Sequence, residues 1–529
     1  MTSIPTDAAD SSPKPRDRYW RSLDELHQND GFINDYLNRE FPVAASEFPE
    51  GVSRRRWMQI MGASLSLAGA AGCRYPTEII APFVVRPEGR LPGETYSRAT
   101  NYELAGRVYN LAVTNVDGRP IKIEGNASHP GSRGGTDAYV QASILGLYDP
   151  DRGRGDSAAL LKRDERGRYQ SANWDEFDTY ARSLVNVAAS NGGASFAVLM
   201  SPTQSPSLAR MISNLRERLP QMTLCRYDGV NGDVMRVATQ QAIGTPCRQS
   251  LQLESARVIL SVQADILGTD PGMVRNARGF SETRNPDQEM SRLYVVEGGY
   301  SNTGVMADTR LSMRPSQMLA FLGELERQID ALTAATELDA APPERGFDEL
   351  EPSEQLAAFL EVVAADLRNG GENAVVVVGE SLGADAVAAG IRINSKLGSL
   401  GRLQRFLPVA DRDLGETVAL PELVQRLNSG RIETLVILGD NPAFTAPGDV
   451  RLGDAIARAE NSIYVGEYHD ETSVRCSWSV PQSHPLESWG DCVGDDGLYG
   501  VCQPQILPLL GGRCAIEVLA RMLGEDDTA

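Results

Sequence analysis

Short apolar runs recur along the chain after residue 173 and alternate with segments of helical periodicity. Runs of this length without polar alternation predict strands that are buried on both faces, as in parallel sheets. Helical patterns between such runs predict βαβ units, so we expect an α/β region built of parallel, Rossmann-like layers. The six runs are Ser195–Met200, Arg257–Val262, Leu293–Glu297, Ala374–Gly379, Thr434–Gly439 and Ser462–Gly466.

A different pattern precedes these runs and predicts a small β-rich module. From Tyr109 to Gly125, apolar residues alternate with polar ones on either side of Asp117-Gly118. An Asp-Gly pair between two alternating segments is a strong hairpin signal, because it suits the positive φ angles of a tight turn. The predicted divisions of the chain are 1–52, 53–73, 74–152 (the opening module) and 153–529, with an acidic, proline-containing surface connection near 337–356.

Loop residues follow several of the apolar runs at the expected carboxyl end of the strand, where open α/β sheets bind ligands. These loops are Gly298–Gly304, Gly379–Gly383 and Gly439–Pro442. None has the form of a GxGxxG fingerprint or a Walker loop, so nicotinamide, flavin and ATP sites have no positive support.

The loop Gly379–Gly383 has the GxSxG form of a nucleophile elbow, with Ser381 at its centre. A hydrolase would also need an acid and a histidine. A plain glycine-rich turn is the alternative interpretation. The downstream candidates for the acid and the histidine are Asp440, Asp470, His469 and His484.

Composition and charge narrow the class of protein. With 529 residues, the chain has room for roughly three domains. Hydrophobic residues make up 41% and charged residues 23%, which indicates a mainly globular chain rather than a multi-span membrane protein. The formal net charge is −20, and a field of that sign repels phosphate backbones. We therefore expect no nucleic-acid partner.

Seven cysteines and four histidines offer little metal chemistry. No two cysteines form a CxxC pair, and the series Cys476, Cys492, Cys502 and Cys514 has the spacing of no compact cluster motif. These residues are ordinary thiols or form a disulfide, which an oxidising compartment would permit. The triplet His469-Asp470-Glu471 is a candidate for metal binding or proton transfer, and a solvated polar loop is the alternative.

The segment 53–73 reads SRRRWMQIMGASLSLAGAAGC and has the form of a twin-arginine export signal. Its signal residues are Arg54, Arg55, Arg56 and Trp57, and the apolar stretch that follows is too short and too rich in Gly and Ala to span a bilayer easily. The alternative is an internal helix with a basic cap. The export interpretation places the protein at the periplasmic face of the cell membrane.

The residues on either side of the arginines add two expectations. The segment 19–59, which leads into the arginines and includes them, resembles the extended translocation domain that precedes large molybdopterin/iron–sulfur-type respiratory subunits, and a solvated tail with local helix is the alternative for its folded state. After the arginines, Cys73 follows Ala70-Ala71-Gly72, which resembles the end of a lipoprotein cleavage box. Lipidation of Cys73 would tether the chain to the membrane surface. The alternatives are a structural thiol and an uncleaved signal.

Three blocks in the opening module resemble the molybdopterin oxidoreductase superfamily: Gly118–Asn126, His129–Gly135 and Leu147–Arg152. Three later blocks resemble the cofactor-free, molybdopterin-like part of the iron–sulfur subunit of alternative complex III, a membrane assembly that oxidises quinol. They are Thr303–Gln317, Leu435–Pro447 and Tyr468–Asp491. The resemblance implies a small β-rich domain followed by the family's parallel-sheet layers.

Departures from the catalytic pattern of that superfamily are as informative as the match. A catalytic member opens with a CxxC…C series, whereas here Cys73 stands alone, and Thr136–Tyr139 replaces the expected last Cys and its Lys. We therefore predict no catalytic, cofactor-binding or metal-ligating residue in this chain. Relatives also continue into a cluster-bearing region, whereas this sequence stops at Ala529, which suggests a split gene or a truncated form.

The resemblance implies a redox-silent subunit that positions an iron–sulfur partner in a respiratory complex. The implied partners are an iron–sulfur subunit, a membrane quinol-binding subunit and haem c subunits. The alternative is an active oxidoreductase that binds molybdopterin guanine dinucleotide without the N-terminal cluster, so whether the chain is an enzyme stays open. A hydrolase acting through Ser381 is a third interpretation.

Overall fold

A computed structural model describes residues 93–525 apart from five gaps, at 105, 154–159, 165–166, 230–232 and 334–350. The chain divides into two compact units, Met1–Ala81 and Pro82–Ala529, and every element described below belongs to the second. The export residues and the lipidation candidate lie outside the described residues; they are Arg54, Arg55, Arg56, Trp57 and Cys73.

The opening module contains a three-stranded antiparallel sheet and one helix. Strands β1 (Thr95–Leu104), β2 (Arg107–Val116) and β3 (Arg119–Gly125) pair in chain order. The β2–β3 turn is Asp117-Gly118, with φ angles of 47° and 85°, which confirms the predicted hairpin. Helix α4 (Ala138–Leu147) is capped by the Asp137 carboxylate, which accepts from the Val140 N–H at 2.8 Å. The helix contributes to a core with β2 and β3.

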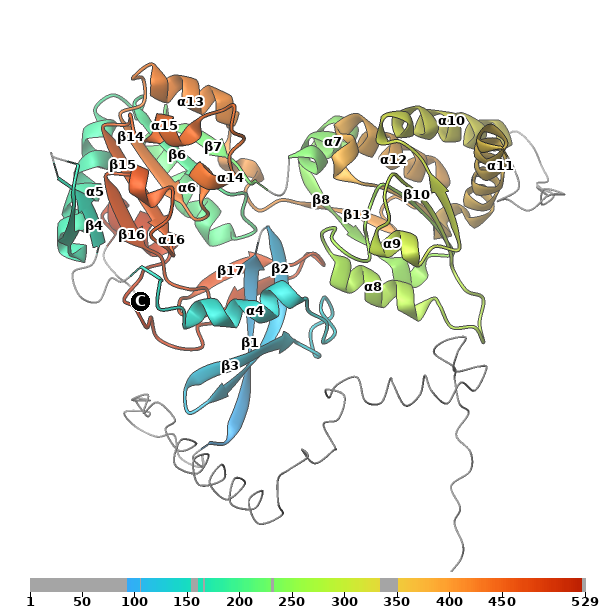
Figure 1. The fold of residues 1–529 in the computed structure, drawn as a ribbon, viewed down its shortest axis with the longest axis horizontal. Coiled ribbons are helices and arrows are strands. Elements are labelled where there is room, and N and C mark those ends of the chain that lie inside the picture. Colours follow the sequence, from blue (N-terminus) through green and yellow to red (C-terminus); the bar gives the residue numbers. More distant parts are fainter. Residues whose placement is uncertain are drawn as a thin grey trace, which may run out of the picture. The chain divides into compact units, whose positions relative to one another are not determined.

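A seven-stranded sheet, in the order β5-β4-β16-β15-β14-β6-β7, forms the first α/β layer (Figure 1). Its inner strands are parallel, and alternate residues are buried on opposite faces. Helices α5, α6 and α16 pack on one face, and α13 and α15 on the other. The strands are β4 (Leu160–Arg163), β5 (Tyr169–Ala172), β6 (Phe196–Met200), β7 (Thr223–Arg226), β14 (Thr434–Leu438), β15 (Asn461–Gly466) and β16 (Trp478–Pro481); the helices are α5 (Trp174–Ala189), α6 (Pro206–Arg218), α13 (Leu420–Asn428), α14 (Pro442–Thr445), α15 (Leu452–Ile456) and α16 (Ala515–Leu523).

A second, four-stranded parallel sheet in the order β11-β10-β9-β12 is inserted between β7 and β14. Its connections to the first sheet run through β8 and β13, which pair antiparallel with each other. Helices α7, α10, α11 and α12 pack on one face, and α8 packs on the other. The strands are β8 (Cys247–Leu251), β9 (Val258–Val262), β10 (Arg292–Glu297), β11 (Thr309–Ser312), β12 (Ala374–Val378) and β13 (Gln404–Pro408); the helices are α7 (Val234–Ile243), α8 (Met273–Glu282), α9 (Asn302–Val305), α10 (Pro315–Thr333), α11 (Pro352–Gly370) and α12 (Ala384–Leu397).

Each of the six apolar runs is a strand of one of these two sheets, namely β6, β9, β10, β12, β14 or β15. The predicted α/β fold with parallel sheets is therefore confirmed. The last residues of the expected acidic connection differ from the prediction, because α11 begins at Pro352. A proline at the first helical position suits a helix start, since its missing N–H would have no partner there. No finding tests the predicted domain boundaries, which remain a prediction.

One hairpin near the end of the chain was not expected from the sequence. Strands β17 (Gly490–Val493) and β18 (Tyr499–Cys502) pair antiparallel, and both contact β1 of the opening module. The Thr100 hydroxyl donates to the Gln503 carbonyl at 2.9 Å and accepts from the Gln503 N–H at 2.9 Å. The C-terminal part of the chain therefore supports the first described strand.

A buried ion pair makes a second connection of this kind. The Arg152 guanidinium and the Glu487 carboxylate approach to 2.7 Å, and their side chains are 1% and 0% exposed. Glu487 also accepts from the N–H groups of His484 at 2.8 Å and Leu509 at 2.9 Å. Arg152 donates in addition to the Leu147 carbonyl at 3.0 Å. Both charges are thus compensated by several hydrogen bonds, as a buried pair requires.

Among the helices of the described ranges, none combines the length and the hydropathy needed to cross a lipid bilayer.

Replacing Arg152 with Met should leave the Glu487 carboxylate buried without its partner. Removing one side of a buried pair costs about 3–5 kcal/mol, so we expect urea denaturation to show a loss of that size in the free energy of unfolding. The matched control is Arg133→Met, which removes a pair with Glu282 whose side chains are 42% and 41% exposed. That change should cost less than about 1 kcal/mol. Equal losses in the two variants would contradict the structural role of the buried pair.

Candidate functional site

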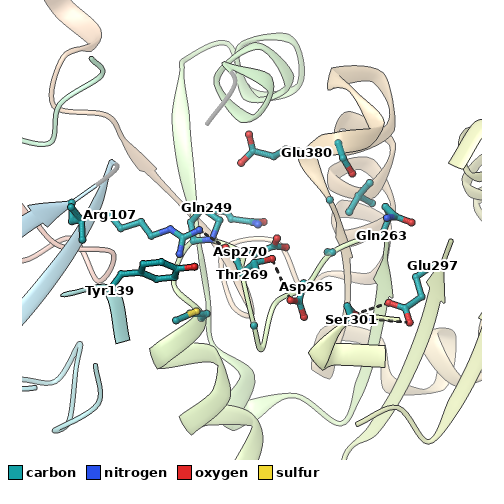
Figure 2. Close-up of a pocket in the computed structure, with 18 of the residues that line it drawn as sticks. Arg107, Tyr139, Gln249, Gln263, Asp265, Thr269, Asp270, Glu297, Ser301 and Glu380 are labelled. Carbon is teal, nitrogen blue, oxygen red and sulfur yellow. Dashed lines mark hydrogen bonds between the residues drawn. The ribbon is translucent and has the colours of Figure 1, made fainter. Parts of the chain in front are cut away.

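A cavity of about 810 Å³ lies at the carboxyl ends of β9, β10 and β12 of the four-stranded sheet (Figure 2). Two of the three loops expected to hold ligands contribute to it, through Ser301 from one loop and Gly379–Ser381 from the other. The third loop borders a separate, much smaller pocket with Asp440. The opening module adds Arg107, Tyr109 and Tyr139.

Close packing of two backbone segments shapes the floor of this cavity. The chain leaves β9 at Gln263, a residue with a positive φ of 52°. Gly379 follows β12 and lies against it: a Cβ atom added there would lie 2.0 Å from the Gln263 carbonyl oxygen. Only glycine therefore fits at this position without a shift of the backbone. The turn after Gln263 then directs Asp265 and Asp270 to the cavity (Figure 2).

Four carboxylates line the cavity, and three of them already accept hydrogen bonds from the protein. Asp265 accepts from the N–H and hydroxyl of Thr303, at 2.9 and 2.8 Å, in the first turn of α9. The Glu380 carboxylate accepts from the Met235 N–H at 3.3 Å, in the first turn of α7. These N–H groups would otherwise be available to an anionic ligand.

The third of these carboxylates, Glu297, is 3% exposed. It accepts from the Ser301 hydroxyl at 2.6 Å (Figure 2). It also accepts from Arg310 Nε at 2.7 Å. Arg310 therefore forms an ion pair with a carboxylate of the protein itself.

Burial raises the pKa of the fourth carboxyl, Asp270, to about 6, with a further rise from the charge of Asp265 and an opposing effect of Arg107. Burial also raises the pKa of Glu380. Arg107 is the cation among the described lining residues, and it donates to the Thr269 carbonyl at the cavity wall (Figure 2). The cavity is therefore acidic near neutral pH.

Molybdopterin guanine dinucleotide does not fit this lining. The group carries phosphates, and proteins hold phosphates with Arg, Lys and unoccupied backbone N–H donors. Here the lining offers four carboxylates, of which Glu297 is paired with Arg310, against Arg107, the single cation among the described lining residues. The Met235 N–H at the start of α7 and the Thr303 N–H at the start of α9 already bind Glu380 and Asp265. A buried polyanion beside these carboxylates would be repelled.

The structure does not bring the residues of the hydrolase interpretation together. Ser381 lines the cavity after β12 of the four-stranded sheet, whereas both histidines follow strands of the other sheet. His469 Nδ1 lies 2.9 Å from the Ser473 hydroxyl, and His484 Nδ1 accepts from the Leu486 N–H at 3.2 Å. Burial lowers the pKa of His484 to about 4. The histidines therefore have structural partners at a distance from Ser381.

The metal candidates of the sequence also have other roles. Asp470 accepts from the N–H groups of Thr472 and Ser473, both at 3.0 Å, and Glu471 accepts from Asn441 at 2.6 Å. Within the described ranges, no group of three or more His, Cys, Asp and Glu side chains is arranged to hold a metal ion. That the whole chain lacks metal-ligating residues stays a prediction.

Sequence reasoning missed most of the cavity lining. Glu297 ends an apolar run, and Gln263 and Asp265 are the first and third residues after another, so their position at the carboxyl ends of strands was a usable signal. Arg107 and Tyr139 carry no such signal, because they reach the cavity only through the packing of the opening module.

Comparisons with known proteins support the family resemblance. No protein-family model matches the chain. A curated relative, named the molybdopterin-binding-like subunit of menaquinone reductase from Nitratidesulfovibrio vulgaris (strain Hildenborough), is 24% identical over 443 residues. The match covers 78% of this chain and 62% of the relative, so the chain spans less than two thirds of the relative's length.

A solved structure, acetylene hydratase from Pelobacter acetylenicus, is similar with a TM-score of 0.60 at 14% identity. That match covers 80% of this chain and 69% of the other. The two comparisons support the resemblance to the molybdopterin oxidoreductase superfamily and confirm the fold type, while the finer resemblance to alternative complex III stays a prediction.

Asp270 should make stability depend on pH. Burial raises its pKa in the folded state to about 6, from about 3.8 for an ordinary Asp carboxyl, so the folded state binds the proton more tightly than the unfolded state does. The resulting stabilisation is fully present below about pH 4 and is lost as the pH rises through 6. Asp270→Asn should therefore raise the free energy of unfolding at pH 8 by about 2 kcal/mol, and the gain should shrink toward pH 4. Urea denaturation across this range measures it.

The matched control is Asp413→Asn, whose carboxylate is 82% exposed. It should change the free energy of unfolding by less than about 0.5 kcal/mol at either pH. A loss of stability in Asp270→Asn at pH 8 would refute the raised pKa of Asp270 in the folded state.

Proposed function

Because this chain resembles the molybdopterin oxidoreductase superfamily in sequence and in fold, we propose that it is a redox-silent subunit of a membrane-associated respiratory electron-transfer complex. The complex is of the alternative complex III type and oxidises quinol. In it, this chain positions an iron–sulfur partner, while a membrane quinol-binding subunit and haem c subunits complete the electron path.

The acidic cavity is the observation that carries this proposal. It lies where open α/β sheets bind ligands, yet its lining repels the phosphates of a pterin dinucleotide and directs helix N–H donors to internal carboxylates. A scaffold that keeps the fold while filling the anion positions with its own side chains suits a structural role. The name of the curated relative, a subunit of menaquinone reductase, supports a quinone-linked complex.

Exposed apolar side chains favour a protein partner. Near the end of the chain, Trp489 is 64% exposed, Tyr499 62% and Leu507 82%. Aromatic and large apolar residues are enriched at the centres of protein interfaces and are costly to leave in water. The net charge of −20 favours a partner surface of opposite sign.

Affinity purification of the tagged chain from native membranes in mild detergent tests the proposal. We expect an iron–sulfur protein and haem c subunits to copurify, and the separated chain to contain molybdenum, tungsten and iron at well below one atom each per chain. Recovery of the chain alone, with about one pterin bound, would overturn the proposal and favour the active oxidoreductase. Recovery with quinone-reducing partners that lack haem c would reject the alternative complex III type.

A pair of variants tests whether Leu507 lies in the interface that the copurification detects. Leu507→Asp places a charge on a side chain that is 82% exposed and should reduce recovery of the partners at least tenfold, whereas Val187→Asp, at 70% exposure on α5, should not. Equal recovery with both variants would exclude Leu507 from the interface.

Export is the second part of the proposal: the twin-arginine pathway carries the chain to the periplasmic face of the membrane, and lipidation of Cys73 tethers it there. Changing Arg54, Arg55 and Arg56 together to Lys should hold the protein in the cytoplasm, because the translocase recognises the arginine pair. Fractionation and immunoblotting measure this, and Cys73→Ser is the control that should leave export intact. Normal export of the triple variant would refute the signal.

A further inference from the structure

The hairpin β17–β18 brings two thiols together. In its antiparallel register, Cys492 faces Gly500 and Cys502 faces Gly490. Residues two apart along a strand share a face, so both cysteines lie on one side of the hairpin, at diagonal positions. Their sulfur atoms are 3.9 Å apart.

We propose that Cys492 and Cys502 form a disulfide when the folded chain meets a low-molecular-weight disulfide. The other described cysteines lie on different elements: Cys225 on β7, Cys247 on β8, Cys476 before β16 and Cys514 before α16. All six are free thiols in this structure. The spacing of cysteines along the sequence left every pairing open, and the hairpin register selects this one.

Glycine opposite Cys502 leaves room for the bond, whereas at Gly500, opposite Cys492, the Asn101 side chain occupies the space of a Cβ atom. No side chain of Gly490 or Gly500 stands between the two thiols, and a Cβ atom added at Gly490 would already lie 3.5 Å from the Cys502 Cβ. A disulfide requires the sulfur atoms to approach to about 2.05 Å. Diagonal positions of a hairpin are farther apart than directly opposite ones. Side-chain rotation together with a backbone adjustment of the hairpin therefore brings the two sulfur atoms together.

The exposure of the two thiols sets the order of the reaction. Cys492 is 1% exposed, while Cys502 is partly exposed. The Cys502 thiolate attacks one sulfur of the external disulfide, forms a mixed disulfide and releases the other half as a thiolate. The Cys492 thiol then loses its proton to solvent and attacks Cys502 Sγ, releasing the second half. The two protein thiols lose two electrons and two protons, and the external disulfide becomes two thiols.

A hydrogen bond with Cys502, together with burial, raises the pKa of Cys492. This favours Cys502 as the first nucleophile, since the thiolate is the reactive form.

The bond would stabilise a junction between two parts of the fold. On one side, β17 and β18 contact β1, next to the paired hydrogen bonds of Thr100 and Gln503. On the other side, the Asp491 carboxylate accepts from the Ser207 hydroxyl at 2.6 Å at the start of α6. A covalent link within the hairpin restrains both sets of contacts, because it reduces the number of conformations that the unfolded hairpin can adopt. The proposal does not depend on the proposed respiratory role.

The test uses the full-length chain, purified with a thiol reductant and then incubated with oxidised glutathione. Free thiols are blocked by alkylation, and the protein is cleaved before Asp495 and Asp496, which lie between the two cysteines. Mass spectrometry without reduction should find the Cys492 and Cys502 peptides joined. Alkylation of both residues after oxidation, or a persistent glutathione adduct on Cys502, would overturn the proposal.

Cysteine variants distinguish the effect of the Cys492–Cys502 disulfide from a general effect of oxidation. Cys502→Ser, at the partly exposed position, should abolish the linked peptides, whereas Cys514→Ser, at another partly exposed cysteine, should retain them. Oxidation should raise the thermal midpoint of the wild type and of Cys514→Ser and leave Cys502→Ser unchanged. Circular dichroism before oxidation confirms that each variant is folded, and Cys502→Ala replaces the Ser variant if it is not. Linked peptides that join other cysteines would also overturn the proposal.

Discussion

The buried pair of Arg152 and Glu487 is the interaction on which the arrangement of the second unit depends. Each group is charged and almost fully excluded from water, so each would be costly without the other. Arg152 ends the block that closes the opening module, whereas Glu487 follows β16 of the seven-stranded sheet. The charges are compensated only when these distant segments are both in place. The opening module and the sheet are therefore energetically interdependent.

Exclusion of water around this pair also shifts the pKa values of neighbouring groups. Glu467 lies near this pair, and burial raises its pKa to about 7, with Arg152 opposing the rise and Glu487 adding to it. Burial also lowers the pKa of His484 to about 4. One fixed guanidinium and one fixed carboxylate thus coexist with neighbours whose charged forms are disfavoured. In a polar interior of this kind, the fixed positions of the side chains determine which groups are charged. A substitution there therefore affects several segments of the chain together.

The strands buried on both faces and two of the loops that line the cavity were predictable from the sequence, whereas the rest of the cavity lining was not. The run Ala374–Gly379 corresponds to β12 because consecutive apolar residues can be buried on both sides of a central parallel strand. The edge strand β11 (Thr309–Ser312) carries polar residues and gives no such signal. The cavity combines Arg107 with Asp270, and their proximity arises from the packing of distant segments, which no local pattern encodes.

In the cavity, backbone N–H groups at the carboxyl ends of the strands bind carboxylates of the chain itself. At the carboxyl ends of parallel strands, helix N–H groups attract anions whether these come from a ligand or from the chain itself. Glu380 and Asp265 supply that negative charge at α7 and α9, so the helix starts are stabilised without any bound group. A ligand with phosphates would have to displace carboxylates that are already hydrogen-bonded, and it would meet the remaining negative charge nearby. The carboxylates of Glu380 and Asp265 therefore both satisfy these N–H groups and add negative charge to the cavity.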